Sequence, residues 1–254
     1  MKKAIVLTLI IIAALVPALA RGLAEMDNSP YVASTSWVAS IAELAGIDGV
    51  QAIAPADMKH PPEYEITADD MVRVMNARLF MNAGYERMMK TIADAAGLDE
   101  SRVVKVKTTN TLENLGNMVI ILSEIAGTQD EGQKRFARLK TLIEAAREEI
   151  VKRGYDRLTV YANTNQAEFA RDLGLNVVAT FGAGPLTADQ LADVARSRYD
   201  LIIDNIHNPV AAPAAEVSPE SKIIIWRNFP DHLGGNALYN VIADNLELLW
   251  SAGL

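Results

Sequence analysis

The three histidines of the chain, His60, His207 and His232, all stand in loops that directly follow predicted strands. Neutral imidazole is the commonest side-chain ligand of transition metals, and carboxylate oxygen is a second ligand that such metals accept. Glu63 follows His60 in the same loop. If the strands are parallel, their carboxyl ends share one edge of a sheet, where these side chains could meet. The sequence therefore predicts a metal site built from His60, His207, Glu63 and His232, although a loop histidine can also be an ordinary turn residue.

Residues 51–70 bring many ligand-type side chains to the end of one predicted strand. An apolar start gives way to a polar loop that holds His60, Glu63 and Tyr64. Thr67 then has the position of an N-cap, and the acidic residues that follow it favour the first turn of a helix. In an open α/β sheet, ligands bind just outside the carboxyl ends of the strands. The loop is therefore predicted to border a ligand site.

Predicted strands and helices alternate along the whole chain. Strands are expected at residues 31–33, 50–54, 78–81 and 103–106, and again at 158–161, 176–179, 201–203 and 223–226. This alternation is typical of parallel sheets covered by helices. Residues 130–153 contain no proline and keep a helical apolar period, which predicts one helix about 33 Å long at 1.5 Å per residue. The predicted fold class is α/β, with two lobes, each a parallel sheet flanked by helices, joined by this long helix.

The first twenty residues have the pattern of a secretory signal peptide. Lys2 and Lys3 precede an apolar run at 4–16 that is short for a membrane span, and residues 18–20 offer a small-x-small cleavage site. An uncleaved anchor is the alternative. Because the chain has no cysteine, no lipid can be attached to one. We expect a periplasmic protein without a lipid anchor, divided into a signal peptide (1–20), a first lobe (21–127), a linking helix (128–153) and a second lobe (154–254).

Charge and missing motifs exclude several classes of function. Loss of Lys2 and Lys3 with the signal peptide changes the formal net charge from −8 to −10, which argues against nucleic acid or an anionic membrane as partner. No P-loop, GxGxxG or nucleophile-elbow pattern is present. Glu63 and Glu65 could act as an acid–base pair, but without a nucleophile or cofactor motif the sequence favours a binding protein over an enzyme.

Three segments carry a resemblance to a known family. They are NARLFMNAGYE at 76–86, NTNQAEFARDLGL at 163–175 and IIIWRNFP at 223–230. Together with the loop at 51–70, they make the chain from Tyr31 onward similar to the metal-specific solute-binding proteins of zinc and manganese ABC importers. The resemblance implies two lobes joined by a long spine helix. It also implies a monomer that captures Zn²⁺ or Mn²⁺ between its lobes as cargo and delivers the ion to an ABC permease in the inner membrane.

The expected metal ligands of that family are mostly absent here. The family uses three histidines and one carboxylate, and the matching positions are at or within two residues of His60, and then Asn110, Asn163 and Asn228. An amide oxygen is a weaker ligand for zinc than imidazole or carboxylate. Either the site has moved to His60, His207 and Glu63 or His232, or the fold is kept for a different cargo.

In the second case, an asparagine-rich cleft would hold a metal chelate or a small polar solute by hydrogen bonds. Aromatic side chains near the same loops, among them Trp37 and Tyr85, could form walls for such a ligand. The residues expected to line this cleft are Asn110, Asn163, Asn228, Asp204 and Tyr64. A periplasmic metal chaperone, which would hand its metal to another protein, is the alternative function.

Overall fold

The computed structural model describes residues 29–94 and 99–254. The predicted signal peptide lies outside the described residues. Among the described residues, no helix is long and apolar enough to cross a bilayer.

The first lobe is built on a parallel sheet of four strands in the order β2-β1-β3-β4. Val32 of β1 pairs with Gln51 of β2 on one side and with Phe80 of β3 on the other. The strands are β1 (Tyr31–Ala33), β2 (Gln51–Ala52), β3 (Leu79–Asn82) and β4 (Val103–Lys105). The helices are α2 (Ser36–Leu44), α3 (Ala68–Asn76) and α4 (Met88–Asp94), with short 3₁₀ turns η1 (Pro61–Glu63) and η2 (Glu100–Arg102). Thr67 caps α3 as predicted, in a reciprocal capping box with Asp70.

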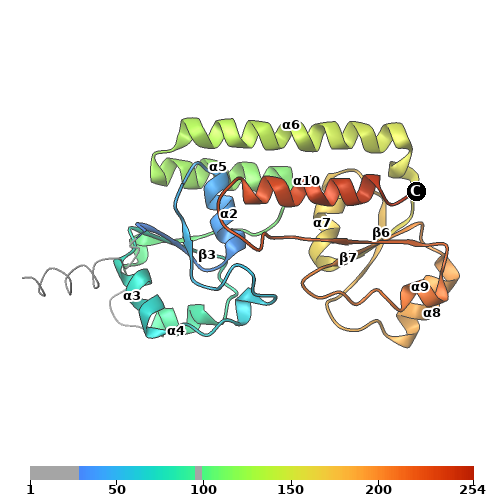
Figure 1. Cartoon of the computed structure of the whole chain (residues 1–254), viewed down its shortest axis with the longest axis horizontal. Coiled ribbons are helices and arrows are strands. Elements are labelled where there is room, and N and C mark those ends of the chain that lie inside the picture. Colours follow the sequence, from blue (N-terminus) through green and yellow to red (C-terminus); the bar gives the residue numbers. More distant parts are fainter. Residues whose placement is uncertain (1–28, 95–98) are drawn as a thin grey trace, which may run out of the picture.

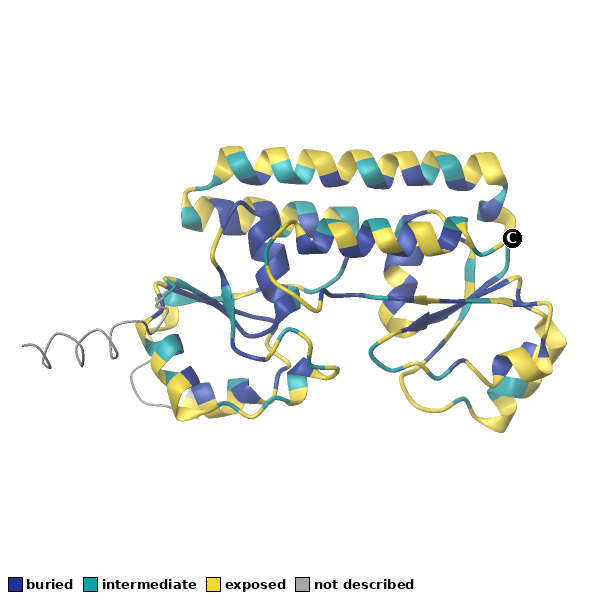
Figure 2. Ribbon diagram, viewed as in Figure 1, coloured by how far each residue is buried: buried dark blue, intermediate teal, exposed yellow. Residues whose placement is uncertain are grey.

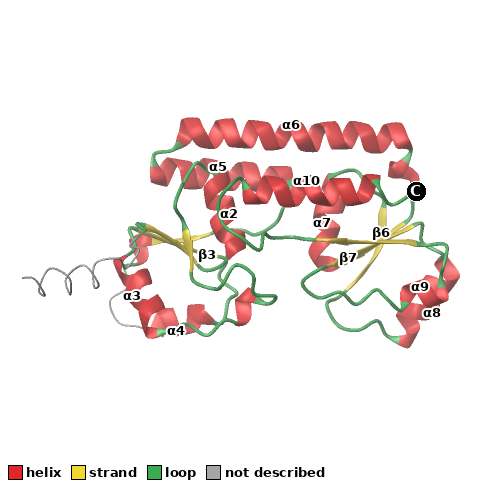
Figure 3. Ribbon diagram, viewed as in Figure 1, coloured by secondary structure: helices red, strands yellow, loops and turns green. Residues whose placement is uncertain are grey.

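The second lobe repeats this architecture with its own parallel sheet in the order β6-β5-β7-β8. Its strands are β5 (Val160–Asn163), β6 (Val177–Phe181), β7 (Leu201–Asn205) and β8 (Lys222–Trp226). Its helices are α7 (Thr164–Asp172), α8 (Ala188–Ser197) and α9 (Ala214–Val217), and the 3₁₀ turn η3 (Tyr155–Arg157) precedes β5. The central strands β5 and β7 are buried along their whole length, as expected for a sheet covered on both faces. The predicted fold class of two parallel α/β lobes is confirmed (Figure 3).

Three long helices form a layer across both lobes: α5 (Leu112–Ala126), α6 (Gln129–Arg153) and α10 (Ala237–Trp250). Figure 1 shows α6 reaching from one lobe to the other, with α5 and α10 beneath it. It lies where the linking helix is predicted and ends at Gly154 in a left-handed C-cap. Helix α5 was not predicted. Its isoleucines, Ile120, Ile121 and Ile125, are all exposed, whereas Leu115, Val119 and Leu122 are buried. Apolar side chains therefore stand on both faces of the helix, which blurs the amphipathic pattern on which the prediction depends.

A hydrophobic core runs through both lobes and this helical layer, and each lobe has a smaller core of its own beside it. Helix α6 contributes Leu139, Ile143, Ala146 and Ile150, which recur at helical spacing on its inner face (Figure 2). Helix α10 packs against α2 of the first lobe as well as against β8 of the second. The C-terminal helix therefore ties the two lobes together alongside α6, and the shared core makes their relative position stiff.

The start of α6 crosses the end of α2 at a close contact between Gly46, which follows α2, and Gly132 of α6. A Cβ atom added to Gly132 would lie 2.8 Å from the Ala45 carbonyl oxygen, which belongs to the rigid backbone. We expect Gly132→Ala to lower the free energy of unfolding by about 1–3 kcal/mol, the usual cost of overpacking. Urea unfolding would measure it. Gly182→Ala is the control because a Cβ there meets nothing within 4 Å; equal effects of the two changes would contradict the packing argument.

Glu43 on α2 connects the first lobe to the loop that leads into α10. Its Oε1 accepts a hydrogen bond from the Gly234 amide at 2.6 Å, whereas its Oε2 is buried with no partner in the described part of the chain. Burial raises the pKa of the Glu43 carboxyl above its ordinary value of 4.5. The neighbouring Asp48 adds to this rise, and the Gly234 bond, Arg135 and His232 oppose it.

The raised pKa predicts a pH-dependent effect of Glu43→Gln. A carboxyl whose pKa is higher in the folded state binds more protons there, so its contribution to stability is lost as pH rises above 4.5. We expect Glu43→Gln to raise the melting temperature at pH 7 relative to the unsubstituted protein, with no gain at pH 4. Glu131→Gln should act in the opposite direction, because hydrogen bonds from Arg135 and Lys134 lower the pKa of Glu131. A gain from Glu43→Gln that is equal at both pH values would rule out this explanation.

Candidate ligand cleft between the two lobes

Each sheet has a topological switch point in its strand order, and loops at both switch points line the same cleft. In the first lobe β1 and β3 are neighbours, and the chain leaves them in opposite directions along the sheet; β5 and β7 do the same in the second lobe. A crevice forms outside the carboxyl ends of strands at such a point. The loops after these strands all contribute to one cleft of about 240 Å³, to which both lobes supply walls.

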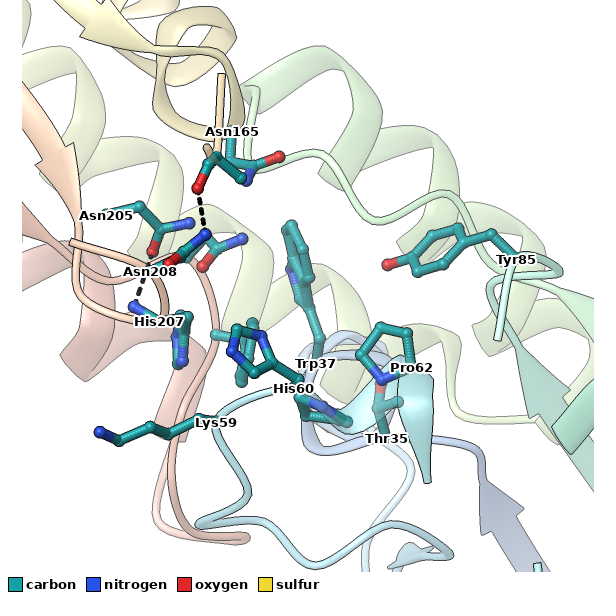
Figure 4. A pocket seen from close by; sticks show the side chains of 14 residues that line it. Thr35, Trp37, Lys59, His60, Pro62, Tyr85, Asn165, Asn205, His207 and Asn208 are labelled. Atoms are coloured by element: carbon teal, nitrogen blue, oxygen red, sulfur yellow. Dashed lines mark hydrogen bonds between the residues drawn. The ribbon is translucent and has the colours of Figure 1, made fainter. Parts of the chain in front are cut away.

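The cleft is lined by imidazole, amide and aromatic side chains. Figure 4 shows His60, Trp37 and Tyr85 from the first lobe and Asn205, His207 and Asn208 from the second. The full lining is Thr35, Trp37, Lys59, His60, Pro61, Pro62, Tyr85, Asn165, Ala183, Asn205, His207, Asn208, Asn228 and Phe229. Among these described residues there is no carboxylate, and Lys59 is the one with a permanent charge.

The wall of the first lobe is fixed by local hydrogen bonds and prolines. Thr35 caps α2, accepting a bond from the Val38 amide at 3.4 Å, and this places Trp37 on the first turn of that helix. Lys59 and His60 are exposed and directly precede Pro61 and Pro62, whose fixed φ angles start η1. The imidazole of His60 therefore lies at the mouth of the cleft.

The imidazole of His207 is held more rigidly than that of His60. Its ring stacks on Phe229, with centroids 3.6 Å apart and planes at 11°. The backbone amide of His207 donates to Asn205 Oδ1 at 3.2 Å. Nε2 of His207 is buried and has no hydrogen-bond partner among the described residues.

The surroundings of His207 keep its ring neutral. Burial, together with the positive charge of Arg227 and the neighbouring His60, lowers the pKa of His207 to about 4, although a hydrogen bond to the Phe229 backbone and the Asp231 charge oppose the fall. Because Nε2 lacks a partner, we assign the bond with the Phe229 carbonyl to Nδ1. The lone pair of His207 is then on Nε2, available to a metal ion or a hydrogen-bond donor.

Asn228 provides a second buried acceptor in the same cleft. Its side chain is 5% exposed, and its Oδ1 has no hydrogen-bond partner within the described residues. Its backbone carbonyl accepts from Asn110 Nδ2 at 2.8 Å, which fixes the residue against the first lobe. A buried acceptor without a donor is costly, so Asn228 Oδ1 and His207 Nε2 are both positioned to meet a ligand.

Asn110 and Asn163 serve the structure of the protein and do not line this cleft. Asn110 Oδ1 accepts from Trp37 Nε1 at 3.0 Å, so both ends of its amide are engaged. Asn163 is fully buried, and its Oδ1 caps α7 by accepting from the Asn165 amide at 3.1 Å. Of the three asparagines at the family's ligand positions, Asn228 alone reaches the cleft.

Asp204 and Tyr64 also lie outside the lining, for a visible reason. The Asp204 carboxylate is 1% exposed and accepts from the amides of Asn205, Val210 and Ala211 at 2.7–2.8 Å. It thereby anchors the loop that carries His207. The Tyr64 hydroxyl donates to Asp70 Oδ2 at 2.9 Å, and its ring packs against the small core beneath α3.

The four predicted metal ligands are not brought together. His60 and His207 line the same cleft, whereas Glu63 is exposed on η1 and His232 is 57% exposed, its Nδ1 lying 3.0 Å from Asp231 Oδ1. In the described part of the chain, no group of three or more His, Cys, Asp or Glu side chains could hold a metal ion. The ligand assignment for His60 and His207 stays a prediction.

Sequence reasoning missed several lining residues, namely Thr35, Asn165, Asn205 and Asn208, whereas Lys59 and Pro62 belong to the loop that was predicted to border the site. Asn205 ends β7, and the others lie in loops after strands or on the first turns that follow, so their position was a usable signal. Their side-chain types gave no signal of a binding site, because asparagine and threonine are also the ordinary residues of caps and turns.

No family model and no curated protein matches the sequence. Solved structures do match the fold. A Mn-bound periplasmic metal binding protein from Candidatus Liberibacter asiaticus is 14% identical with a TM-score of 0.61, and the match covers 86% of this chain and 97% of that one. The laminin binding protein of Streptococcus agalactiae, a bifunctional protein with adhesin and metal transporting activity, is 16% identical with a TM-score of 0.64, covering 87% and 98%. The predicted resemblance is confirmed at the level of the fold.

Proposed function

We propose that this protein is the substrate-binding component of an ABC importer. It captures a cargo containing a transition metal in the cleft between its lobes, in the periplasm, and delivers it to a permease in the inner membrane. The observation that carries the proposal is the meeting of both topological switch points in one cleft that presents two imidazoles. Among proteins of the same fold, one is a Mn-bound periplasmic metal binding protein and another has metal transporting activity.

Three uncharged donors of this chain would contact the metal. His207 Nε2 is buried, neutral and directed by its stacking on Phe229, and Asn228 Oδ1 is the buried acceptor beside it in the cleft wall. His60 would add a second imidazole from the opposite lobe. Manganese accepts mixed nitrogen and oxygen ligands of this kind, and zinc also accepts the imidazoles.

Binding would involve a small rearrangement of the lobes. Besides α6 and α10, direct bonds already join the lobes: Ser36 Oγ donates to the Pro230 carbonyl at 2.7 Å, and Asn110 Nδ2 donates to that of Asn228. The rings of Trp37 and Phe229 pack across the same boundary at 5.6 Å. Exposed His60 on its proline-flanked loop, rather than a hinge between lobes, is then the part that adjusts to cargo.

The proposal is tested with residues 21–254 and a permease–ATPase pair from the same genome, reconstituted in vesicles. A ligand that binds only the folded state stabilises it by about 2.7 kcal/mol when its concentration is a hundred times Kd. Each kcal/mol raises the melting temperature of a protein of this size by about 2–4 °C. We expect cargo to raise the melting temperature and the loaded protein to stimulate ATP hydrolysis. A metal chaperone would bind cargo without stimulating the pair, and that result would contradict the importer assignment.

A further inference from the structure

The cleft provides few strong donors for a bare metal ion. His60 and His207 supply two imidazoles and Asn228 supplies a buried amide oxygen without a partner, and all three are uncharged. The other oxygens of the lining side chains are also neutral, in amides and hydroxyls, and are weaker ligands for a transition metal than imidazole or carboxylate. Zinc sites in proteins are four-coordinate, and manganese takes up to six ligands. A bare ion would therefore depend on weak neutral oxygens or on water for its remaining one to three positions.

The charge of the lining also disfavours the binding of a bare cation. No carboxylate stands among the described lining residues, and the charged one, Lys59, is positive. A divalent ion would bring two uncompensated charges into a partly desolvated cleft, at a considerable electrostatic cost.

The size and remaining walls of the cleft suit an organic group. A volume of about 240 Å³ greatly exceeds the space of one ion and its donor atoms. Amides of Asn165, Asn205 and Asn208 line one side, and the Trp37 ring lies on the other. Apolar walls with a few placed polar groups are typical of sites for small organic ligands.

We infer that the cargo is a metal chelate, in which a small anionic organic chelator already holds the transition metal ion. His60, His207 and Asn228 would take the open positions of the metal, and Lys59 with the asparagine amides would bind the carboxylates of the chelator. The chelator would supply both the missing donors and the missing negative charge. This inference rests on the proposed function, and it names the class of cargo.

The direct test is mass spectrometry under non-denaturing conditions on the protein purified from its own periplasm. We expect a bound mass larger than one metal ion, which separates on unfolding into a metal and an organic acid. Bound metal alone would overturn the chelate and leave the proposed function standing. An organic molecule without metal would overturn both the chelate and the metal cargo, and would leave only the importer assignment standing. Absence of any cargo, together with no stimulation of the permease–ATPase pair, would overturn both.

A titration gives an independent test with defined probes. Mn²⁺ and Zn²⁺ are added as chlorides and as their citrate complexes to residues 21–254, and binding is followed by calorimetry. We expect the citrate complex of at least one metal to bind ten or more times more tightly than its chloride. Lys59→Gln should weaken the citrate complex about tenfold and should not weaken the chloride, because it removes a positive charge that attracts the chelator and repels a bare cation. Lys140→Gln on the outer face of α6 should change neither. Equal or tighter binding of the chlorides would overturn the inference.

Discussion

Replacing Asp204 with alanine is expected to lower the free energy of unfolding by about 3–5 kcal/mol. The carboxylate is buried and accepts three backbone N–H groups, from Asn205, Val210 and Ala211. Without it these donors are left without partners in the interior, at about 1–3 kcal/mol each, less whatever water can recover. Chemical unfolding monitored by circular dichroism would measure the loss. The same change should abolish cargo binding, because the three bonds hold the loop that presents His207.

Asp200→Ala provides the matched control at the opposite end of β7. The Asp200 carboxylate also accepts from a backbone amide and a hydroxyl, both of Thr159, but it is exposed, so water can replace it. We expect a loss below about 1 kcal/mol and unchanged cargo binding. If Asp204→Ala were no more harmful than Asp200→Ala, the loop would not depend on the buried carboxylate.

Substituting His207 is expected to weaken cargo binding at least a hundredfold, about 2.7 kcal/mol. Loss of a group that only supports a metal ligand costs ten- to a hundredfold in affinity, so loss of a ligand itself should cost no less. His207→Phe is the sharper variant, because it can keep a ring stacked on Phe229 while removing Nε2. Calorimetric titration with the native cargo, recovered from the periplasmic protein, would measure the change.

The third histidine, His232, provides the control for this prediction. His232 is exposed and bonded to Asp231, outside the cleft. His232→Ala should bind cargo as the unsubstituted protein does, and His60→Ala should be weakened. Should the His232 variant lose binding while the His207 variant keeps it, the cleft would be assigned to the wrong residues.

The fold could be predicted closely because its signals are local and repeated. Alternation of short apolar strands with amphipathic helices specifies a parallel sheet, and its restart after Gly154 specifies a second one. The predicted N-cap at Thr67 fixed where α3 begins. The path of α10 back onto the first lobe was not predictable, because nothing in its own amphipathic pattern says which partner covers its apolar face.

The site could be predicted only as far as the sheet edge that holds it. Both His60 and His207 follow strands, and the topology brings them to one cleft. Some polar side chains at that edge point into the cleft, and others are taken up by backbone N–H groups that need hydrogen-bond acceptors. Asn163 caps α7, and Asp204 anchors a loop. His232 lies in a turn just before Gly234 and Gly235, which both have positive φ. Residue type and spacing alone do not distinguish these uses from ligand binding.

Anomalous diffraction at the metal absorption edge, from crystals of the cargo-loaded protein, tests the central claim most directly. We predict one metal peak in the cleft between the lobes, about 2.0–2.3 Å from a ring nitrogen of His207 and of His60, with density for an organic group around the remaining positions. A metal peak elsewhere on the molecule, or a cleft occupied without any contact to His207, would contradict the account.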